Sequence, residues 1–86
     1  MIQFTDHAER KIKQRNLKKA WIRKVVENPE YVVKSYGNRR VAYRKIGKLY
    51  LATVFVKEKN NLVVLTAHWD KAFKPDKIKR EEGNRK

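Results

Sequence analysis

The chain has 86 residues, which is enough for one hydrophobic core and too few for two ordinary domains. It carries 23 Lys and Arg residues against 9 acidic ones, for a formal net charge of +14, and it has no Cys. Such a charge favours a polyanionic partner, because self-repulsion otherwise disfavours the compact state. The lack of Cys excludes a disulfide scaffold, a thiolate nucleophile and a Cys-containing zinc site, and it fits a cytoplasmic protein.

A Lys-rich solvated surface of the hot-adapted kind is the alternative explanation of the charge, but such surfaces usually hold Glu in comparable number. Acidic residues are scarce here, so we expect a surface that binds nucleic acid or phosphate. Membrane insertion is not expected. The longest apolar runs, 49–56 and 62–67, are far shorter than a bilayer span, and residues 1–4 do not begin a signal peptide.

A first helix is predicted over Asp6–Arg15. Thr5 or Asp6 can cap it, and Glu9 stands at the capping-box position relative to Asp6. Asn16 tolerates the left-handed conformation that ends many helices, so we expect the chain to turn there.

A second amphipathic helix follows the turn. Its apolar residues recur at the spacing of one helical face: Leu17, Trp21, Ile22, Val25 and Val26. Basic residues, Lys18 and Lys19 among them, fill the other face. Asn28-Pro29 is predicted to end this helix.

From Tyr31 onward, short runs rich in β-branched and aromatic residues alternate with turn residues such as Gly37-Asn38 and Gly47-Lys48. We predict four strands, at Tyr31–Tyr36, Arg39–Ile46, Leu49–Lys57 and Leu62–Trp69. The tight turns favour an antiparallel meander with the two helices on one face. The predicted class is therefore α+β, with a domain over residues 1–73 and a charged tail, a frayed helix or a disordered segment, over 74–86.

The first helix carries a ridge of candidate catalytic residues. His7, Lys11 and Arg15 follow one another at i+4 spacing, Gln14 sits beside them and Arg10 flanks them. Cleaving RNA through its own 2′-hydroxyl needs a base for that proton, a cation for the phosphorane charge and an acid for the leaving 5′-oxygen. The ridge supplies an imidazole and cations, although a lone His near a helix start is more often a partly exposed residue with no role.

The last predicted strand adds a polar end. Period-two alternation puts His68 on the same face as Thr66 and Val64, and it puts Leu65, Ala67 and Trp69 on the other. Two interpretations stay open. Thr66 and His68 complete a site, or Thr66 is a core hydroxyl bonded to backbone and His68 is a strand-end residue turned to water.

The strand over Arg39–Ile46 divides its cations between two faces. One face carries Arg40, Ala42 and Arg44, and the other carries Arg39, Val41, Tyr43 and Lys45. We expect a row of basic side chains on the face of the sheet that the helices do not cover. The tyrosines at 36, 43 and 50 can stack bases, but aromatic residues in strands are more often cross-strand packing partners.

No metal or other cofactor is expected. Two His and no Cys give little for zinc, and the acidic residues do not cluster into a site for Mg²⁺ or Ca²⁺. No Gly-rich loop is present to cradle a nucleotide, and Ser35 lacks the context of a nucleophile elbow.

These residues together resemble a known family. The run from His7 to Leu17, the helix end from Val25 to Glu30 and the strand from Val63 to Trp69 resemble a bacterial and archaeal family of uncharacterised domains that open with a His-Ala helix and close with a Thr-Ala-aromatic strand. Such domains are grouped with RelE-like and ParE-like toxins and with barnase, EndoU and colicin nucleases. The resemblance implies two N-terminal helices on an antiparallel sheet, metal-independent RNA cleavage, often on the ribosome, and inhibition by a cognate antitoxin.

The resemblance carries the family's helix residues onto His7, Lys11 and Arg15, and its strand-end polar position onto Thr66, with His68 beside it. The chain departs from the pattern twice. Lys11 stands where the family has Arg. The lysine keeps the positive charge but cannot make the bidentate hydrogen bonds to phosphate that an arginine makes. His68 stands where an aromatic residue is usual.

We therefore expect a toxin-type endoribonuclease with His7 as base or acid. The remaining candidate catalytic residues are Lys11, Arg15 and Arg40 as phosphate clamps, Thr66 and His68 to complete the pocket, and Tyr43. The expected nucleic-acid-binding residues are Arg10, Gln14, Lys18, Lys19, Arg39, Arg44 and Lys45. The first alternative is a non-catalytic RNA- or ribosome-binding module of the same fold, and the second is a module that receives an acidic protein such as an antitoxin.

Overall fold

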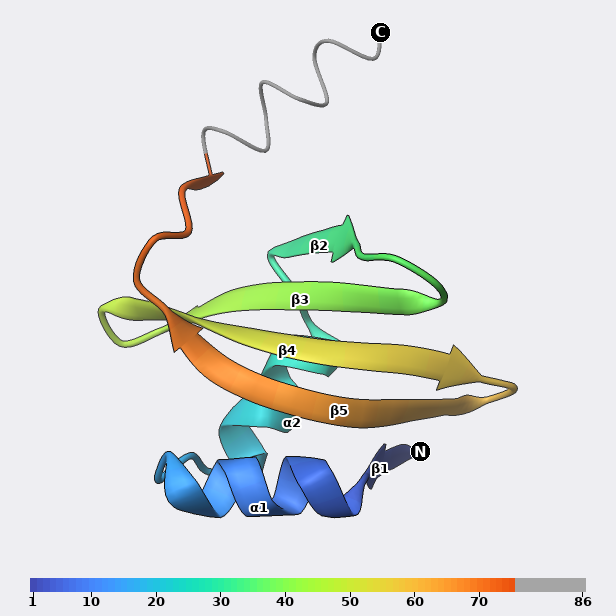
Figure 1. The fold of residues 1–86 in the computed structure, drawn as a ribbon. Coiled ribbons are helices and arrows are strands. Elements are labelled where there is room, and N and C mark those ends of the chain that lie inside the picture. Colours follow the sequence, from blue (N-terminus) through green and yellow to red (C-terminus); the bar gives the residue numbers. More distant parts are fainter. Residues whose placement is uncertain (76–86) are drawn as a thin grey trace, which may run out of the picture.

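Two helices and five strands make up residues 1–75, the part of the chain that our computed structural model describes (Figure 1). In chain order they are β1 (Ile2–Phe4), α1 (Asp6–Gln14), α2 (Lys19–Glu27), β2 (Tyr31–Lys34), β3 (Arg39–Ile46), β4 (Leu49–Glu58) and β5 (Asn61–Asp70). The predicted α+β class is confirmed. The charged tail predicted over 74–86 lies outside the described residues from position 76 on.

The sheet has the strand order β1-β5-β4-β3-β2. The predicted meander of β2 to β5 is antiparallel throughout, but β1 pairs in parallel with β5 through Ile2 and Phe4. The prediction of a four-stranded antiparallel sheet is therefore wrong, and the sheet is five-stranded and mixed. With only Ile2, Gln3 and Phe4, β1 is too short for period-two alternation to indicate a strand.

Helix α1 begins at a side-chain cap and ends at a left-handed residue. The Thr5 hydroxyl accepts a hydrogen bond from the Ala8 backbone N–H at 3.0 Å, which satisfies one of the free donors of the first turn. The capping box predicted for Glu9 is wrong, since Glu9 instead forms an ion pair with Lys19 at 2.8 Å. Asn16 has φ 55°, as its predicted role in ending the helix requires.

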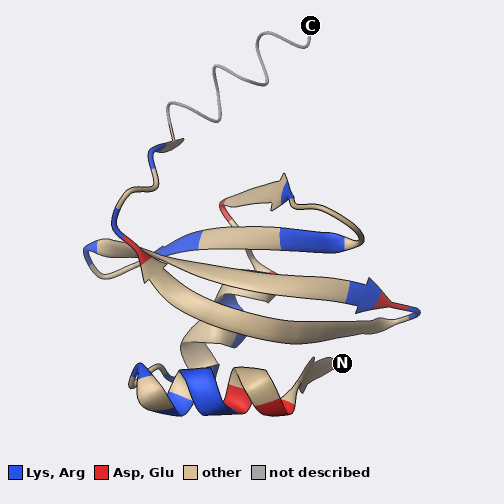
Figure 2. Ribbon diagram, in the orientation of Figure 1, with Lys and Arg blue, Asp and Glu red and all other residues tan. Residues whose placement is uncertain are grey.

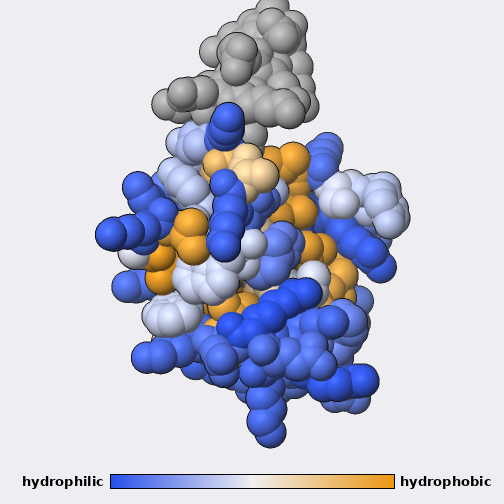
Figure 3. All heavy atoms as spheres, turned by 60° about the vertical axis from the view of Figure 1, so that its left-hand side comes forward, coloured by the Kyte–Doolittle hydropathy of each residue, from blue (hydrophilic) through white to orange (hydrophobic). Residues whose placement is uncertain are grey.

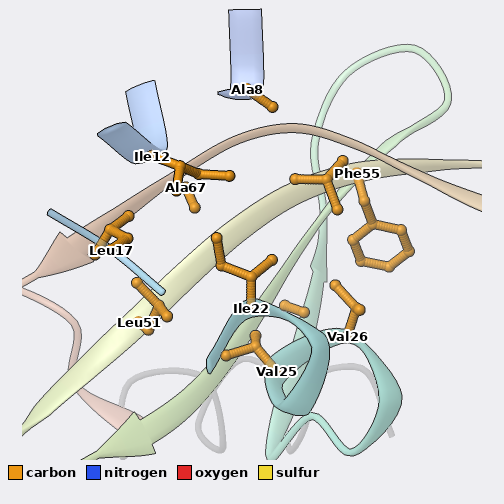
Figure 4. Packing of buried hydrophobic residues seen from close by; sticks show 11 residues of the cluster. Ala8, Ile12, Leu17, Ile22, Val25, Val26, Leu51, Phe55 and Ala67 are labelled. Atoms are coloured by element: carbon orange, nitrogen blue, oxygen red, sulfur yellow. The ribbon is translucent and has the colours of Figure 1, made fainter. Parts of the chain in front are cut away.

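The core lies between the two helices and one face of the sheet (Figure 4). Ala8 and Ile12 of α1 pack with residues of β5, while α2 lies against β3 and β4. The tilted rings of Trp21 and Trp69, 5.7 Å apart, extend this packing to the end of β5. Because both helices bury their apolar stripes against the same face, they leave the other face of the sheet open.

A β-bulge interrupts β5 in the middle of the sheet. Thr66 pairs with Val54, but Val64 pairs with Phe55, so Leu65 is an extra residue between the two registers. A bulge of this kind shifts the alternation of side chains by one position.

The bulge corrects one sequence prediction. Val64 is fully buried in the core, so it does not share a face with Thr66. Thr66 and His68 do share a face, the open one, and Leu65 joins them there. Leu65 and Thr66 line the candidate site described below.

We predict that Thr5→Ala lowers the free energy of unfolding by about 1 kcal/mol, because the substitution removes the cap of α1. Thr5→Ser is the matched control, since it keeps the hydroxyl and should lose much less. Urea unfolding of the three proteins measures the difference. Equal losses in both variants would show that the hydroxyl does not hold the helix start.

Candidate nucleic-acid interface

A cleft of about 510 Å³ opens on the uncovered face of the sheet, beside the start of α1. Its lining comes from α1, β3, β4, β5 and the segments next to them: Thr5, His7, Ser35, Tyr36, Arg39, Val54, Leu65 and Thr66. His7 and Thr66, which are far apart in the sequence, therefore lie in one cleft. The opening helix and the last strand converge as the candidate site requires.

The far end of the α1 ridge is held on β5 by Arg15. Its Nη1 donates a hydrogen bond to the Ala67 carbonyl oxygen at 2.7 Å and a longer one to the Thr66 hydroxyl at 3.4 Å. The interpretation of Thr66 as a core hydroxyl bonded to backbone is therefore wrong. Lys11 lies one turn from His7 and one turn from Arg15, so the ridge runs along the edge of the open face.

The faces of β3 follow from Ala42, which is fully buried in the core and so marks the helix side. Arg40 and Arg44, in register with it, lie on that side too, and Arg44 donates to the Asn28 carbonyl oxygen at 2.8 Å. Arg39 and Lys45 lie on the open side. The structure thus does not bring Arg40 to the cleft with His7, where we expected it, and places Arg39 there instead.

A second, cationic pocket of about 320 Å³ adjoins Arg39 at the far end of the sheet. It is lined by Lys34, Gly37, Asn38, Arg39, Arg40 and Lys57. Figure 2 shows these basic positions where β2, β3 and β4 meet that end. Four cations around one pocket, with no carboxylate among its lining residues, suit the binding of a phosphate group. Arg39 lines both this pocket and the cleft, so it joins the two.

Tyr43 lies on the open face but outside the cleft, under another ring. Its ring stacks on Phe73 with centroids 3.8 Å apart and planes 11° from parallel. Burial, helped by the negative charge of Asp70, raises the pKa of Tyr43 above its ordinary 10.0. Tyr43 therefore keeps its proton at neutral pH and can act as a hydrogen-bond donor, not as a base.

His68 lies beside the cleft and not among its lining residues. In the sheet register it is opposite Ala52, which in turn is opposite Tyr43. It shares the open face with Thr66, two residues away and about 7 Å along the strand. A polymeric ligand bound along the open face reaches His68 only if it extends beyond the cleft.

The other expected nucleic-acid-binding residues are spread over the molecule. Lys18 lies over the Trp21 ring, and Lys19 is held by Glu9 and by the ring of Phe4. Three more lie on the surface away from the cleft lining: Arg10 on the other flank of α1, Gln14 at its end and Lys45 on β3. The Lys and Arg residues among them raise the general potential of the surface without forming one site with His7.

The positive charge of residues 1–75 is almost uncompensated by local pairing. Within residues 1–75, the structure shows one ion pair, between Lys19 and Glu9. The view in Figure 3 shows a mainly hydrophilic surface around limited hydrophobic patches. Unpaired cations at this density attract polyanions at long range.

Sequence reasoning missed part of the cleft. Ser35 and Leu65 line it and were not expected there. Tyr36, which was considered for base stacking, also lines it, and its 82% exposed side chain lies with the ring centroid 5.8 Å from the Arg39 guanidinium. The bulge that turns Leu65 outward leaves no mark in a run of apolar residues. The Tyr-Gly-Asn-Arg sequence of the β2–β3 turn was the one available signal, since a hairpin places its turn residues beside its strand ends.

Neither a metal cluster nor a membrane span is found in the described part of the chain. Residues 1–75 contain no group of three or more His, Asp or Glu side chains placed to hold a metal ion. None of their helices has the length and apolar character needed to cross a bilayer.

Comparison with known proteins gives a family and nothing more specific. Residues 4–69 match a family described as a domain of unknown function, DUF4258. That span runs from the end of β1 to the last residues of β5 and includes both helices. No curated protein and no solved structure matches the chain.

Because the pKa of Tyr43 is raised in the folded protein, the unfolded chain ionises first as the pH increases. The stabilisation from Tyr43 is therefore complete below pH 10.0 and is lost as the pH rises through the raised value. We predict that Tyr43→Phe loses less unfolding free energy than the parent protein when urea unfolding is repeated at increasing alkaline pH. Equal losses of unfolding free energy in the two proteins would contradict the raised pKa of Tyr43.

Proposed function

Because the chain belongs to the DUF4258 family, whose function is unknown, we propose a function from its site: metal-independent, toxin-type cleavage of RNA. One observation carries the proposal, namely that His7, Arg39 and Thr66 line a single cleft on the open face. Cleavage through the 2′-hydroxyl needs a base, an acid and a cation, and the cleft supplies an imidazole for one of the proton transfers and a guanidinium for the phosphorane charge.

In this reaction the 2′-oxygen of a ribose attacks the adjacent phosphorus, and the bond from phosphorus to the 5′-oxygen breaks. The 2′-hydroxyl loses its proton to a base, and the departing 5′-oxygen gains one from an acid. The products are a 2′,3′-cyclic phosphate and a 5′-hydroxyl. His7 would serve as that base or that acid, because an imidazole can exchange a proton near neutral pH.

The negative charge that builds on the phosphorane is to be met by cations around the cleft. Arg39 lies in the cleft, and Lys11 and Arg15 follow His7 along the ridge of α1. Arg15 is already aimed at Thr66 by its hydrogen bonds to β5. A cation fixed before the substrate binds costs no reorganisation during the reaction.

The fold supports a RelE-like assignment as part of this proposal. Two helices precede the antiparallel strands β2 to β5, as the resemblance of the His-Ala helix and the Thr-Ala strand implies, while the parallel strand β1 departs from that layout. Ribosome-bound mRNA as substrate and an acidic antitoxin as inhibitor come with that assignment. A net charge of +14 is complementary to both.

We predict that the purified protein cleaves RNA in the presence of a metal chelator and leaves 2′,3′-cyclic phosphate ends. His7→Ala should lower the cleavage rate by about 10²- to 10⁴-fold, the usual contribution of a positioned acid or base. Arg23→Ala is the matched control, because it removes one exposed charge from α2, on the helix side of the sheet. Its rate should stay near that of the parent protein.

Cleavage that persists undiminished in His7→Ala would remove His7 from the mechanism. Failure of the parent protein to cut either free or ribosome-bound RNA would overturn the enzyme and leave a binding module.

The second candidate is a non-catalytic RNA- or ribosome-binding module, and two observations favour it. His7 is the one imidazole among the cleft residues, and Tyr43 is covered by Phe73. Among the described residues, the cleft lining thus holds no second imidazole and no carboxylate, and Tyr36 is its one phenol. Lys11 also cannot make the bidentate hydrogen bonds to phosphate that an Arg in its place would make.

Both candidates predict RNA binding that weakens steeply with salt, because bound phosphates release counterions. Arg39→Ala should weaken the affinity for a short oligoribonucleotide more than Arg23→Ala, since Arg39 lines the cleft and the cationic pocket together. Fluorescence anisotropy at several salt concentrations measures both affinities. Equal weakening by the two substitutions would indicate that general charge, and not this face, binds RNA.

A further inference from the structure

Four aromatic rings gather on the open face, at the end of the sheet away from the cationic pocket. Phe73, three residues beyond β5, stacks on Tyr43, while Tyr31 and Tyr50 approach it at centroid distances of 5.6 Å and 4.9 Å. The two tyrosines are inclined to the Phe73 ring by 58° and 63°. The Phe73 ring thus stacks on Tyr43 and is bordered by Tyr31 and Tyr50. The three tyrosines form an aromatic pocket, and Phe73 occupies it.

The floor of this pocket is Ala52. It is fully buried although it points to the open face, and in the register it lies between Tyr43 and His68. It is not part of the cluster between the helices and the sheet, and its neighbour in the register, Tyr43, is stacked against Phe73. A small floor residue leaves room for a planar ring between larger neighbours.

The segment that carries Phe73 is lightly attached. No strand pairing continues beyond Asp70 within the described residues, and the turn that follows is held by the Ala72 N–H donating to the Asp70 carboxylate at 3.0 Å. Lys71, Ala72 and Lys74 are exposed. The Phe73 ring can therefore leave the pocket without breaking the sheet.

We propose that Tyr31, Tyr43 and Tyr50 form a nucleobase-binding pocket that Phe73 occupies in the free protein and vacates when RNA binds. The inference rests on the proposed RNA-binding function. A nucleobase is flat and stacks face to face on aromatic side chains, as Phe73 does on Tyr43.

The position of the pocket along the sheet supports this occupant. Ala52, its floor, and Val54, which lines the cleft, are two residues apart on β4 and therefore about 7 Å apart on the same face. One nucleotide can span that distance. A strand with its phosphate at Arg39 and His7 can thus place a neighbouring base over Tyr43.

Phe73 then competes with RNA, and removing its ring should strengthen binding. The test measures affinities by fluorescence anisotropy in a His7→Ala background, so that the RNA stays intact. Phe73→Ala should bind a short oligoadenylate about tenfold more tightly than its background protein, the scale of one base stacking on an aromatic ring. An oligomer of the same length without bases should bind both proteins equally.

Two further variants separate pocket opening from other effects. Phe73→Tyr keeps a ring in the pocket and should show the background affinity. Adding Tyr43→Ala to Phe73→Ala removes the stacking surface and should cancel the gain. Circular dichroism of each variant establishes that the fold is retained, and loss of the Phe73 ring-current shifts in the background protein on addition of oligoadenylate reports displacement directly.

Several results would overturn the inference. These are an unchanged or weaker affinity in Phe73→Ala, an equal gain for the oligomer without bases, a gain in Phe73→Tyr, or Phe73 resonances that stay shifted in the RNA complex. They leave the proposed function standing, since RNA still binds. Absence of RNA binding in every protein, the background one included, would instead reject the proposed function itself and the pocket with it.

Discussion

The packing of α1 along β5 is the constraint from which the candidate site follows. Ala8 and Ile12 are buried in the core, so the helix can take only one rotation about its axis. That rotation leaves the ridge with His7 at the rim of the open face, next to Thr66. The bond from Arg15 to the backbone of β5 holds the other end of the helix in the same position. Burial of these two apolar residues therefore determines where the imidazole and the cations lie.

The positive charge of the chain determines which class of partner the open face of the sheet can bind. A chain with +14 net charge and one ion pair among its described residues is stabilised when a polyanion covers its cations. The open face combines such cations with a cleft and with aromatic rings, and single-stranded nucleic acid uses all three, as phosphates, riboses and bases. The opposite face is filled by α2 and the core (Figure 4). The molecule thus has one face of the sheet covered by the helices and one open face, which we propose binds RNA.

Periodicity and turn residues predicted both helices, the end of α1 at Asn16 and the antiparallel order of four strands, because those features depend on local sequence. Three features were not predictable, since each depends on tertiary packing. Strand β1 is too short to show a period, and the bulge at Leu65 shifts alternation without any change in residue type. The choice between Arg39 and Arg40 for the cleft required knowing which face of β3 the helices cover. The resemblance could name His7 and Thr66, and the sequence could name Arg39 as a nucleic-acid-binding residue, but only the fold could place Arg39 in the cleft with them.

The most direct test of the account is to map the proposed RNA-binding face by backbone amide chemical shifts, titrating the isotope-labelled His7→Ala protein with a short oligoribonucleotide. The account predicts the largest changes at position 7, Arg39 and Thr66, with few on α2. Changes confined to α2 around Arg23, with the open face unaffected, would contradict it.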